Sequence, residues 1–121
     1  MSAPEGPLVV GVDSSTQSTK ALVVDAATGQ VVARGQAPHT VTPGPGRESD
    51  PEEWWIALGA ALEQCGRVVQ EAAAVSVGGQ QHGLVTLDAD GRPVRPALLW
   101  NDVRSAPQSD RLIERLGGPQ Q

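Results

Sequence analysis

The chain has 121 residues and a formal net charge of −5, so it has room for one domain at most and offers no strongly basic face for nucleic acid. No apolar stretch approaches a membrane span, and a single cysteine excludes both an internal disulfide and a cysteine-based zinc site. The first residues carry no basic start and no apolar signal core. We therefore expect a cytoplasmic protein with neither a membrane nor a nucleic-acid partner.

Residues 1–7 are expected to form a disordered lead-in, and the chain from Leu8 to Asp25 then predicts a β-hairpin. An apolar run ends at Asp13, small polar residues follow, and a second apolar run begins at Ala21. Such a turn offers N–H groups and hydroxyls to a phosphate chain, and the carboxylate suits Mg²⁺. An ordinary hairpin with a solvated Ser/Thr turn explains the pattern equally well. Neither the Walker pattern nor the dinucleotide fingerprint is present.

A turn at Thr28 and Gly29 leads to a third predicted strand over residues 31–37, which completes an antiparallel meander. Residues 38–47 form a connector rich in Pro and Gly. It carries His39, which we expect on the surface, as is usual for a single histidine in a loop.

The clearest helix start in the chain is at Asp50, a candidate N-cap that is followed by Pro51 at the first helical position. Glu53 lies three residues beyond Asp50, as in a capping box. Apolar residues then recur at helical spacing and predict a face that packs in the core. They are Trp54, Leu58, Ala61, Leu62, Cys65 and Val69. Gly66 is expected to weaken the end of this helix.

After this helix, residues 73–77 predict a buried strand that is parallel to the first strand. It ends in a polar cluster, Gln80 to Gly83, where the carboxyl ends of strands in such sheets commonly bind ligands. A histidine and two amides there suit a polyhydroxy or carbonyl compound, although His82 could equally cap a loop. Residues 84–87 predict a further strand, closed by a turn at residues 88–91.

Residues 96–100 predict a short extended run that leads into Trp100, Asn101, Asp102 and Arg104. An indole ring beside polar side chains suits a carbohydrate, while a core tryptophan followed by a surface Asp–Arg pair is the alternative. The last pattern, residues 109–116, predicts a helix that ends at residues 117–119. We expect its apolar residues to point inward: Leu112, Ile113 and Leu116.

Four of these motifs occur in one order: Asp13 to Thr16, Ser49 to Trp55, Gly79 to Gly83, and Leu98 to Arg104. The series resembles the amino-terminal part of the FGGY family of carbohydrate kinases, within the actin-like ATPase superfamily, over residues 8–118. Two positions depart from the family pattern. Ser15 stands where the family has Gly, and Gln81 stands where Met is more frequent.

The resemblance implies an α/β fold with a ribonuclease-H-like core. Residues 8–121 would be the amino-terminal portion of the first kinase domain, without its later part or the second lobe. It also implies ATP-dependent phosphorylation of a sugar hydroxyl, with D-xylulose as the leading substrate and D-xylulose 5-phosphate as the product.

The resemblance assigns a role to each motif residue. Asp13 would act in catalysis by orienting Mg²⁺, through water, near the transferring phosphoryl group. The ATP phosphates would be bound by Thr16, Gln17, Ser18 and Lys20. Gln81 and His82 would hold the sugar, and Trp100 and Asp102 would help to form its pocket. ATP and Mg²⁺ are thus the expected co-substrate and metal ion.

In this family the general base is an Asp that lies beyond the region of resemblance. We therefore expect this chain to be the opening fragment of a longer kinase, inactive and weakly folded by itself. The sequence leaves open whether the full-length enzyme forms a homodimer. The alternatives are a kinase for another sugar or polyol, and a non-catalytic protein that binds sugar or nucleotide. A ribonuclease-H-like nuclease is disfavoured by the acidic charge and by the sugar-type loops.

Overall fold

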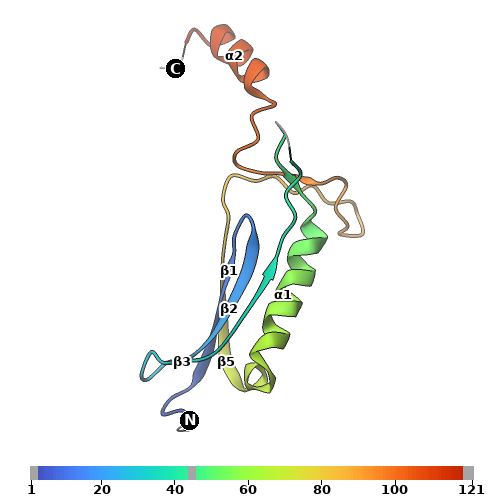
Figure 1. Ribbon diagram of the computed structural model, residues 1–121. Coiled ribbons are helices and arrows are strands. Elements are labelled where there is room, and N and C mark those ends of the chain that lie inside the picture. Colours follow the sequence, from blue (N-terminus) through green and yellow to red (C-terminus); the bar gives the residue numbers. More distant parts are fainter. Residues whose placement is uncertain (1–2, 44–45, 119–121) are drawn as a thin grey trace.

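A computed structural model describes residues 3–43 and 46–118. Its main body is a four-stranded sheet with helix α1 (Pro51–Cys65) on one face (Figure 1). The strands are β1 (Leu8–Ser14), β2 (Ser18–Asp25), β3 (Val31–Pro38) and β5 (Ala72–Gly79), in the order β3-β2-β1-β5. The 3-10 helix η1 (Arg67–Glu71) links α1 to β5. Within the described ranges, no helix is long and apolar enough to cross a membrane.

The predicted meander is confirmed, because β1 pairs antiparallel with β2 and β2 pairs antiparallel with β3. The second strand begins earlier than expected, at Ser18. Ser18 and Thr19 are both buried, and these polar residues extend the ladder down to a turn of three residues. The N–H of Ser15 closes that turn by donating to the carbonyl of Ser18 at 2.9 Å.

Helix α1 begins as predicted, with Asp50 as its N-cap and Pro51 in the first turn. The Asp50 carboxylate accepts from the N–H of Glu52 at 3.0 Å. The predicted capping box is wrong, because the Glu53 carboxylate does not turn back to the N–H of Asp50 and instead accepts from the N–H of Thr40 at 3.1 Å. Gly66 caps the other end of the helix at a φ of 78°.

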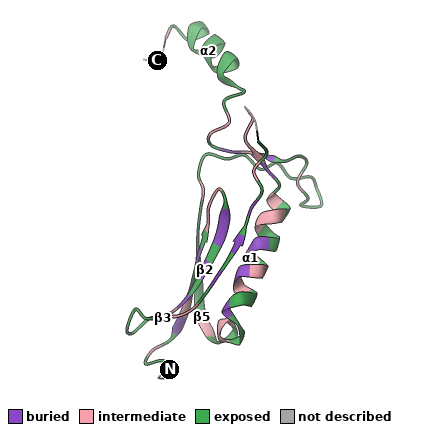
Figure 2. Ribbon diagram, in the orientation of Figure 1, coloured by how far each residue is buried: buried purple, intermediate pink, exposed green. Residues whose placement is uncertain are grey.

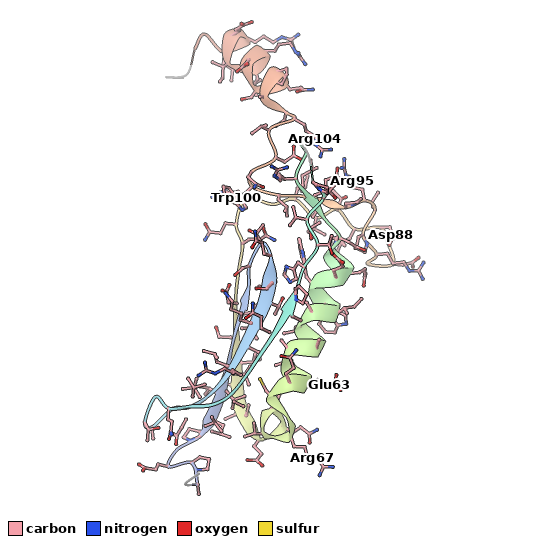
Figure 3. All side chains as sticks on the ribbon, in the orientation of Figure 1. Glu63, Arg67, Asp88, Arg95, Trp100 and Arg104 are labelled. Atoms are coloured by element: carbon pink, nitrogen blue, oxygen red, sulfur yellow. The ribbon has the colours of Figure 1, made fainter. Side chains whose placement is uncertain are left out.

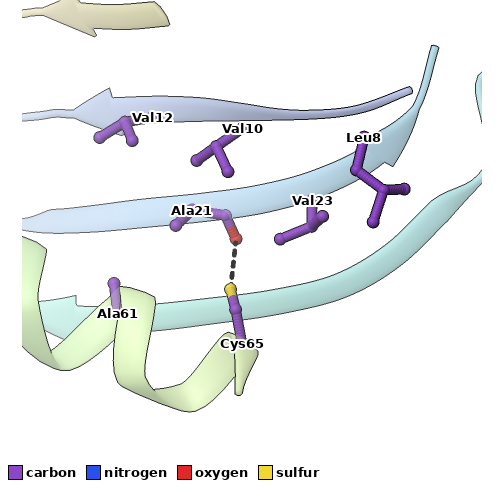
Figure 4. Close-up of a cluster of buried hydrophobic side chains, with 7 residues drawn as sticks. All are labelled: Leu8, Val10, Val12, Ala21, Val23, Ala61 and Cys65. Atoms are coloured by element: carbon purple, nitrogen blue, oxygen red, sulfur yellow. Dashed lines mark hydrogen bonds between the residues drawn. The ribbon is translucent and has the colours of Figure 1, made fainter. Parts of the chain in front are cut away.

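One face of α1 packs on β2 and β3 and encloses the core (Figures 2 and 4). The predicted helix face contributes Ala61 and Cys65 to it, with Leu58, Leu62 and Val69 packed around the edge. The buried cluster consists of Leu8, Val10, Val12, Ala21, Val23, Ala61 and Cys65. Burial raises the pKa of the Cys65 thiol, as for an inert core residue.

The strand predicted over residues 73–77 is present as β5 and runs parallel to β1, as expected. Its predicted burial is wrong, because Val75 is 65% exposed and Val77 is 61% exposed. Both residues pair with core residues of β1, namely Val10 and Val12. Helix α1 lies over β2 and β3, so this side of the edge strand is left open.

A smaller unit forms around two short strands that pair antiparallel, β4 (Glu48–Ser49) and β6 (Ala97–Leu98). The prediction of a strand over residues 84–87 is wrong. This segment forms two isolated antiparallel β-bridges, one between Leu84 and Leu98 and one between Leu87 and Pro93. The turn at residues 88–91 is confirmed by a bond from the N–H of Asp88 to the carbonyl of Arg92 at 2.8 Å.

Helix α2 (Ala106–Arg115) projects from the body, at the red end of the chain in Figure 1. The expectation that its apolar residues point inward is wrong. Leu112 is 57% exposed, Ile113 is 36% exposed and Leu116 is 55% exposed. The predicted stop is supported by positive φ angles of 88° and 116° at Gly117 and Gly118, while Pro119 lies outside the described residues.

Two segments expected to be irregular have defined partners. In the lead-in, where residues 1–2 are not described, the N–H of Glu5 donates to the Asp25 carboxylate at 2.7 Å. This bond lowers the pKa of Asp25.

The connector carries His39, and residues 44–45 of this segment are not described. The prediction that His39 lies on the surface is wrong. His39 is only 8% exposed, and its Nε2 lies 2.6 Å from Oγ1 of Thr19.

Candidate functional site

Asp13 lies near the end of β1, directly opposite Lys20 of β2 in the strand register. Their neighbours Val12 and Ala21 are buried under α1, so alternation puts Asp13 and Lys20 on the other face of the sheet. Both side chains are exposed. A carboxylate and an ammonium group therefore stand side by side on the open face, next to the turn between β1 and β2.

These two residues line a groove of about 490 Å³ on that face. Its other lining residues come from β1, β2 and β5: Gly11, Val12, Leu22, Val24, Ser76 and Gly78. A side chain built at Gly11 would meet no atom within 4 Å. The small residues at Gly11, Ser76 and Gly78 leave room above the backbone, where a ligand can approach the strands closely.

The turn between β1 and β2 meets two distant segments through Thr16. Its hydroxyl donates to Oε1 of Gln80, 64 residues along the chain, at 3.3 Å. The same hydroxyl accepts from Nε1 of Trp100, 84 residues away, at 3.3 Å (Figure 3). The N–H of Gln80 also donates to the carbonyl of Ser14 at 3.2 Å. The structure thus joins the turn, the end of β5 and Trp100 at one place.

The remaining turn residues are placed differently from one another. Gln17 is exposed, and its carbonyl accepts from the N–H of His39 at 2.7 Å. Ser18 is buried, and its hydroxyl accepts from Nε2 of Gln36 at 3.3 Å. The Gln17 side chain is therefore available to a ligand, whereas the Ser18 hydroxyl keeps its O–H to donate but is buried within the sheet.

Gln81 and His82 follow Gln80 directly and are exposed. His82 has a φ of 60°, a left-handed conformation that residues with a side chain seldom adopt. Such backbone strain is concentrated at functional sites, because the surrounding structure must hold it in place. Both side chains are free to meet a ligand beside the Thr16 turn.

Asp102 lies two residues beyond Trp100, but its carboxylate is turned into the small unit, with a side chain only 3% exposed. The guanidinium of Arg104 and then the N–H of Arg47 hold the pKa of this carboxyl far below its ordinary value. The same contact raises the pKa of Arg104. Asp102 therefore belongs to the support of the site rather than to its surface.

The residues present fit a magnesium ion that shares its shell with water and phosphate. In residues 3–43 and 46–118, no group of three or more His, Cys, Asp and Glu side chains gathers as a metal cage. Asp13 is a single exposed carboxylate on the groove. Mg²⁺ keeps several waters and binds through one or two carboxylates plus substrate phosphates, so one carboxylate is sufficient.

Sequence reasoning did not assign Gln80 a role of its own, although it lies inside the polar cluster that was predicted. It also missed the part of Arg47 in holding Asp102. The Asp–Arg pair offered as the alternative is present, although the Asp102 side chain is buried and not on the surface. Partners 55 or more residues apart leave no periodic signal, so only the folded chain reveals Arg47 beside Asp102 and Thr16 beside Gln80.

Residues 8–121 match the N-terminal domain of the FGGY family of carbohydrate kinases. The chain is 81% identical to a xylulose kinase from Streptomyces coelicolor and 80% identical to one from Streptomyces rubiginosus, over 98% of this chain in each case. It spans about a quarter of the length of these curated relatives, 24% of each.

Among solved structures, the xylulose kinase from Bifidobacterium adolescentis superposes with a TM-score of 0.81 at 51% identity. That match covers 93% of this chain and 21% of the other. It confirms the predicted fold class, an α/β amino-terminal domain of the ribonuclease-H-like, actin-like ATPase type. The family match extends from the first strand to the end of the sequence, and the chain therefore belongs to the FGGY family of carbohydrate kinases.

Proposed function

We propose that the natural protein containing this chain transfers a phosphoryl group from ATP to a hydroxyl of D-xylulose, giving D-xylulose 5-phosphate. The observation that carries the proposal is the meeting of the Thr16 turn, the Gln80–His82 strand end and Trp100. A phosphate-type turn lies there beside a polar and aromatic surface that suits a sugar. The 81% identity to a protein described as a xylulose kinase supports this choice of sugar.

On the nucleotide side, Asp13 would hold Mg²⁺ through water, and Lys20 beside it would add positive charge for the phosphates. Gln17 is the best placed of the side-chain donors because it is exposed, whereas the Thr16 hydroxyl already donates to Gln80 and the Ser18 hydroxyl is buried. Bound Mg²⁺ neutralises charge on the phosphate oxygens. The chain's own residues then position the donor, which supplies most of the catalysis in phosphoryl transfer.

On the sugar side, Gln81 and His82 would bind hydroxyl and carbonyl groups, and the ring of Trp100 would offer an apolar face. Asp102 would help to form this pocket from behind. Residues 8–121 would belong to the first kinase domain. The general base, the later part of that domain and the adenine-binding lobe would come from other parts of the natural protein, which we expect in the cytoplasm.

The proposal is tested by offering ATP, Mg²⁺ and a panel of sugars to the full-length natural protein, with D-xylulose, D-ribulose, glycerol and gluconate as acceptors. We expect kcat/KM to be highest for D-xylulose. Asp13→Asn should lower kcat by at least about 100-fold, since a charged positioning group is lost. Asp90→Asn, on the distant 88–91 turn, is the matched control and should leave kcat unchanged.

Higher kcat/KM for another acceptor would make the protein a kinase for that sugar, an outcome that Gln81 in place of the usual Met would explain. Binding of sugar or nucleotide without any turnover would instead identify a non-catalytic binding protein.

A further inference from the structure

The Asp102 carboxylate is surrounded by donors from two neighbouring segments. It accepts from the N–H of Arg47 at 2.8 Å and from the N–H of Arg104 at 3.0 Å. The guanidinium of Arg104 approaches the same carboxylate through Nε at 2.9 and 3.0 Å and through Nη2 at 2.7 Å. A carboxylate has about four lone-pair sites, and these donors occupy them.

The pair formed by Asp102 and Arg104 is itself fixed by its surroundings. The Glu48 carboxylate accepts from Arg104 Nη1 at 2.8 Å and from Arg95 Nη2 at 2.6 Å (Figure 3). A side chain built at Gly46 would lie 2.6 Å from Arg104 Nη2, so the guanidinium rests directly on that backbone. Arg104 thus cannot leave Asp102 without also breaking its bond to Glu48 and its packing against Gly46.

Backbone hydrogen bonds of Arg47 and Asp102 also fix the turn that carries Trp100. The N–H of Leu99 donates to the carbonyl of Arg47 at 2.9 Å, and the N–H of Asp102 donates to the carbonyl of Leu99 at 3.0 Å. Leu99 is 3% exposed, so the start of the turn is anchored in the small unit. Trp100 lies between these two anchors, and its indole N–H reaches Thr16.

We propose that Asp102 is a positioning residue, which acts on the sugar site through Trp100 and does not contact the sugar. Its buried, fully bonded carboxylate has no acceptor capacity left for a hydroxyl, whereas the indole that it holds faces the site. This inference rests on the proposed function, because it specifies how the same sugar pocket is built.

A double-mutant cycle in the full-length natural protein separates the two roles. Asp102→Asn and Trp100→Ala should each raise KM for the sugar by about tenfold, and the double variant should be no worse than Trp100→Ala. If Asp102 touched the sugar, the two effects would multiply to about a hundredfold. That multiplication would overturn the proposal.

The matched control is Asp88→Asn. Asp88 also accepts from two backbone N–H groups, those of Asp90 and Arg92 at 2.9 Å each, but within residues 3–43 and 46–118 it shares no hydrogen-bond partner with Trp100. It should change KM by less than about twofold. Arg104→Lys keeps the charge and removes the guanidinium fork, so it serves as the second variant if Asp102→Asn does not fold.

Hydrogen exchange provides a measurement that needs no turnover. Asp102→Asn should speed amide exchange over residues 99–104 and over the turn at residues 15–17, with both unchanged in Asp88→Asn. Unaltered exchange over residues 99–104 would overturn the positioning role even in an active enzyme. A wild-type protein that phosphorylates none of the sugars would overturn the proposed function, and exchange would still decide whether Asp102 holds this turn.

Discussion

The buried polar side chains Thr19 and His39 depend on each other for hydrogen bonding. Thr19 is fully buried, and its hydroxyl lies 2.6 Å from His39 Nε2. Among the described residues, the buried Nδ1 atom of the same ring has no hydrogen-bond partner, and the ring centroid lies 6.4 Å from that of Trp54. The histidine is therefore part of the packing between β2, the connector and the start of α1.

Thr19→Val keeps the shape of the side chain but removes the hydrogen-bond partner of the buried His39 Nε2. We expect it to lower the free energy of unfolding by about 1–3 kcal/mol, the cost of an unsatisfied buried polar group. Urea unfolding of the full-length natural protein measures this. Thr42→Val, at an exposed position, is the control and should stay within about 0.5 kcal/mol. Equal effects of the two variants would contradict the role of the pair.

The lowered pKa of Asp102 predicts how its contribution to stability depends on pH. Arg104 and the N–H of Arg47 favour the ionised carboxylate in the folded protein. Its contribution is therefore present above the ordinary pKa of 3.8 and is lost as pH falls below that value, through the folded pKa. Urea unfolding from pH 7 to pH 3 should show Asp102→Asn less stable than the wild type near neutrality, with a gap that narrows below pH 4. A gap that widens on acidification would contradict this linkage.

At the scale of elements, α1 approaches β3 so closely that only glycine fits between them. A side chain built at Gly35 would overlap the carbonyl oxygen of Ala61 and lie 3.0 Å from Cβ of Gln64. Gly35 pairs with Ala21, which is fully buried. This contact sets the distance between the helix and the sheet and hence the thickness of the core.

Gly35→Ala should force α1 away from the sheet and destabilise the protein by about 1–3 kcal/mol or more, as overpacking does. The matched control is Gly59→Ala on the exposed side of α1, where the new methyl meets no atom within 4 Å. That change should stabilise the helix by up to about 1 kcal/mol, because alanine is the better helix former. Thermal or urea unfolding of the natural protein gives both values, and opposite signs are the expected result.

At the scale of the whole molecule, one side of the sheet and helix remains apolar and open. Trp55 is 72% exposed on α1, and Val75 and Val77 are more than half exposed on β5. β5 is also an edge strand of the four-stranded sheet. An exposed edge with adjacent apolar side chains is a template for association.

The 121-residue chain by itself is therefore expected to self-associate or to fold weakly. Sedimentation velocity over a range of concentrations, with melting followed in parallel, measures this. Val75→Lys should shift the chain toward the monomer, whereas Val94→Lys, at a position 65% exposed outside this surface, should not. A sharp two-state melt of a monomer would contradict the prediction.

The sequence by itself determined the elements whose signals are local. The hairpin and meander follow from alternating apolar residues, and the start of α1 follows from Asp50 and Pro51, whose effects act within one helical turn. The order of the four motifs also led to the family. These features could be predicted because neighbouring residues specify them, whatever the rest of the chain does.

Tertiary structure alone decided which faces are covered and which distant residues meet. The valines of β5 and Leu112 of α2 are exposed, although their patterns are apolar, because periodicity marks a face and does not supply the element that covers it. Thr16 meets Gln80 and Trp100, and Asp102 meets Arg47, across 55 to 84 residues of chain. Such contacts depend on how the sheet, the helix and the small unit pack together. Most residues of the candidate site could therefore be predicted from the sequence, but which of them contact each other could not.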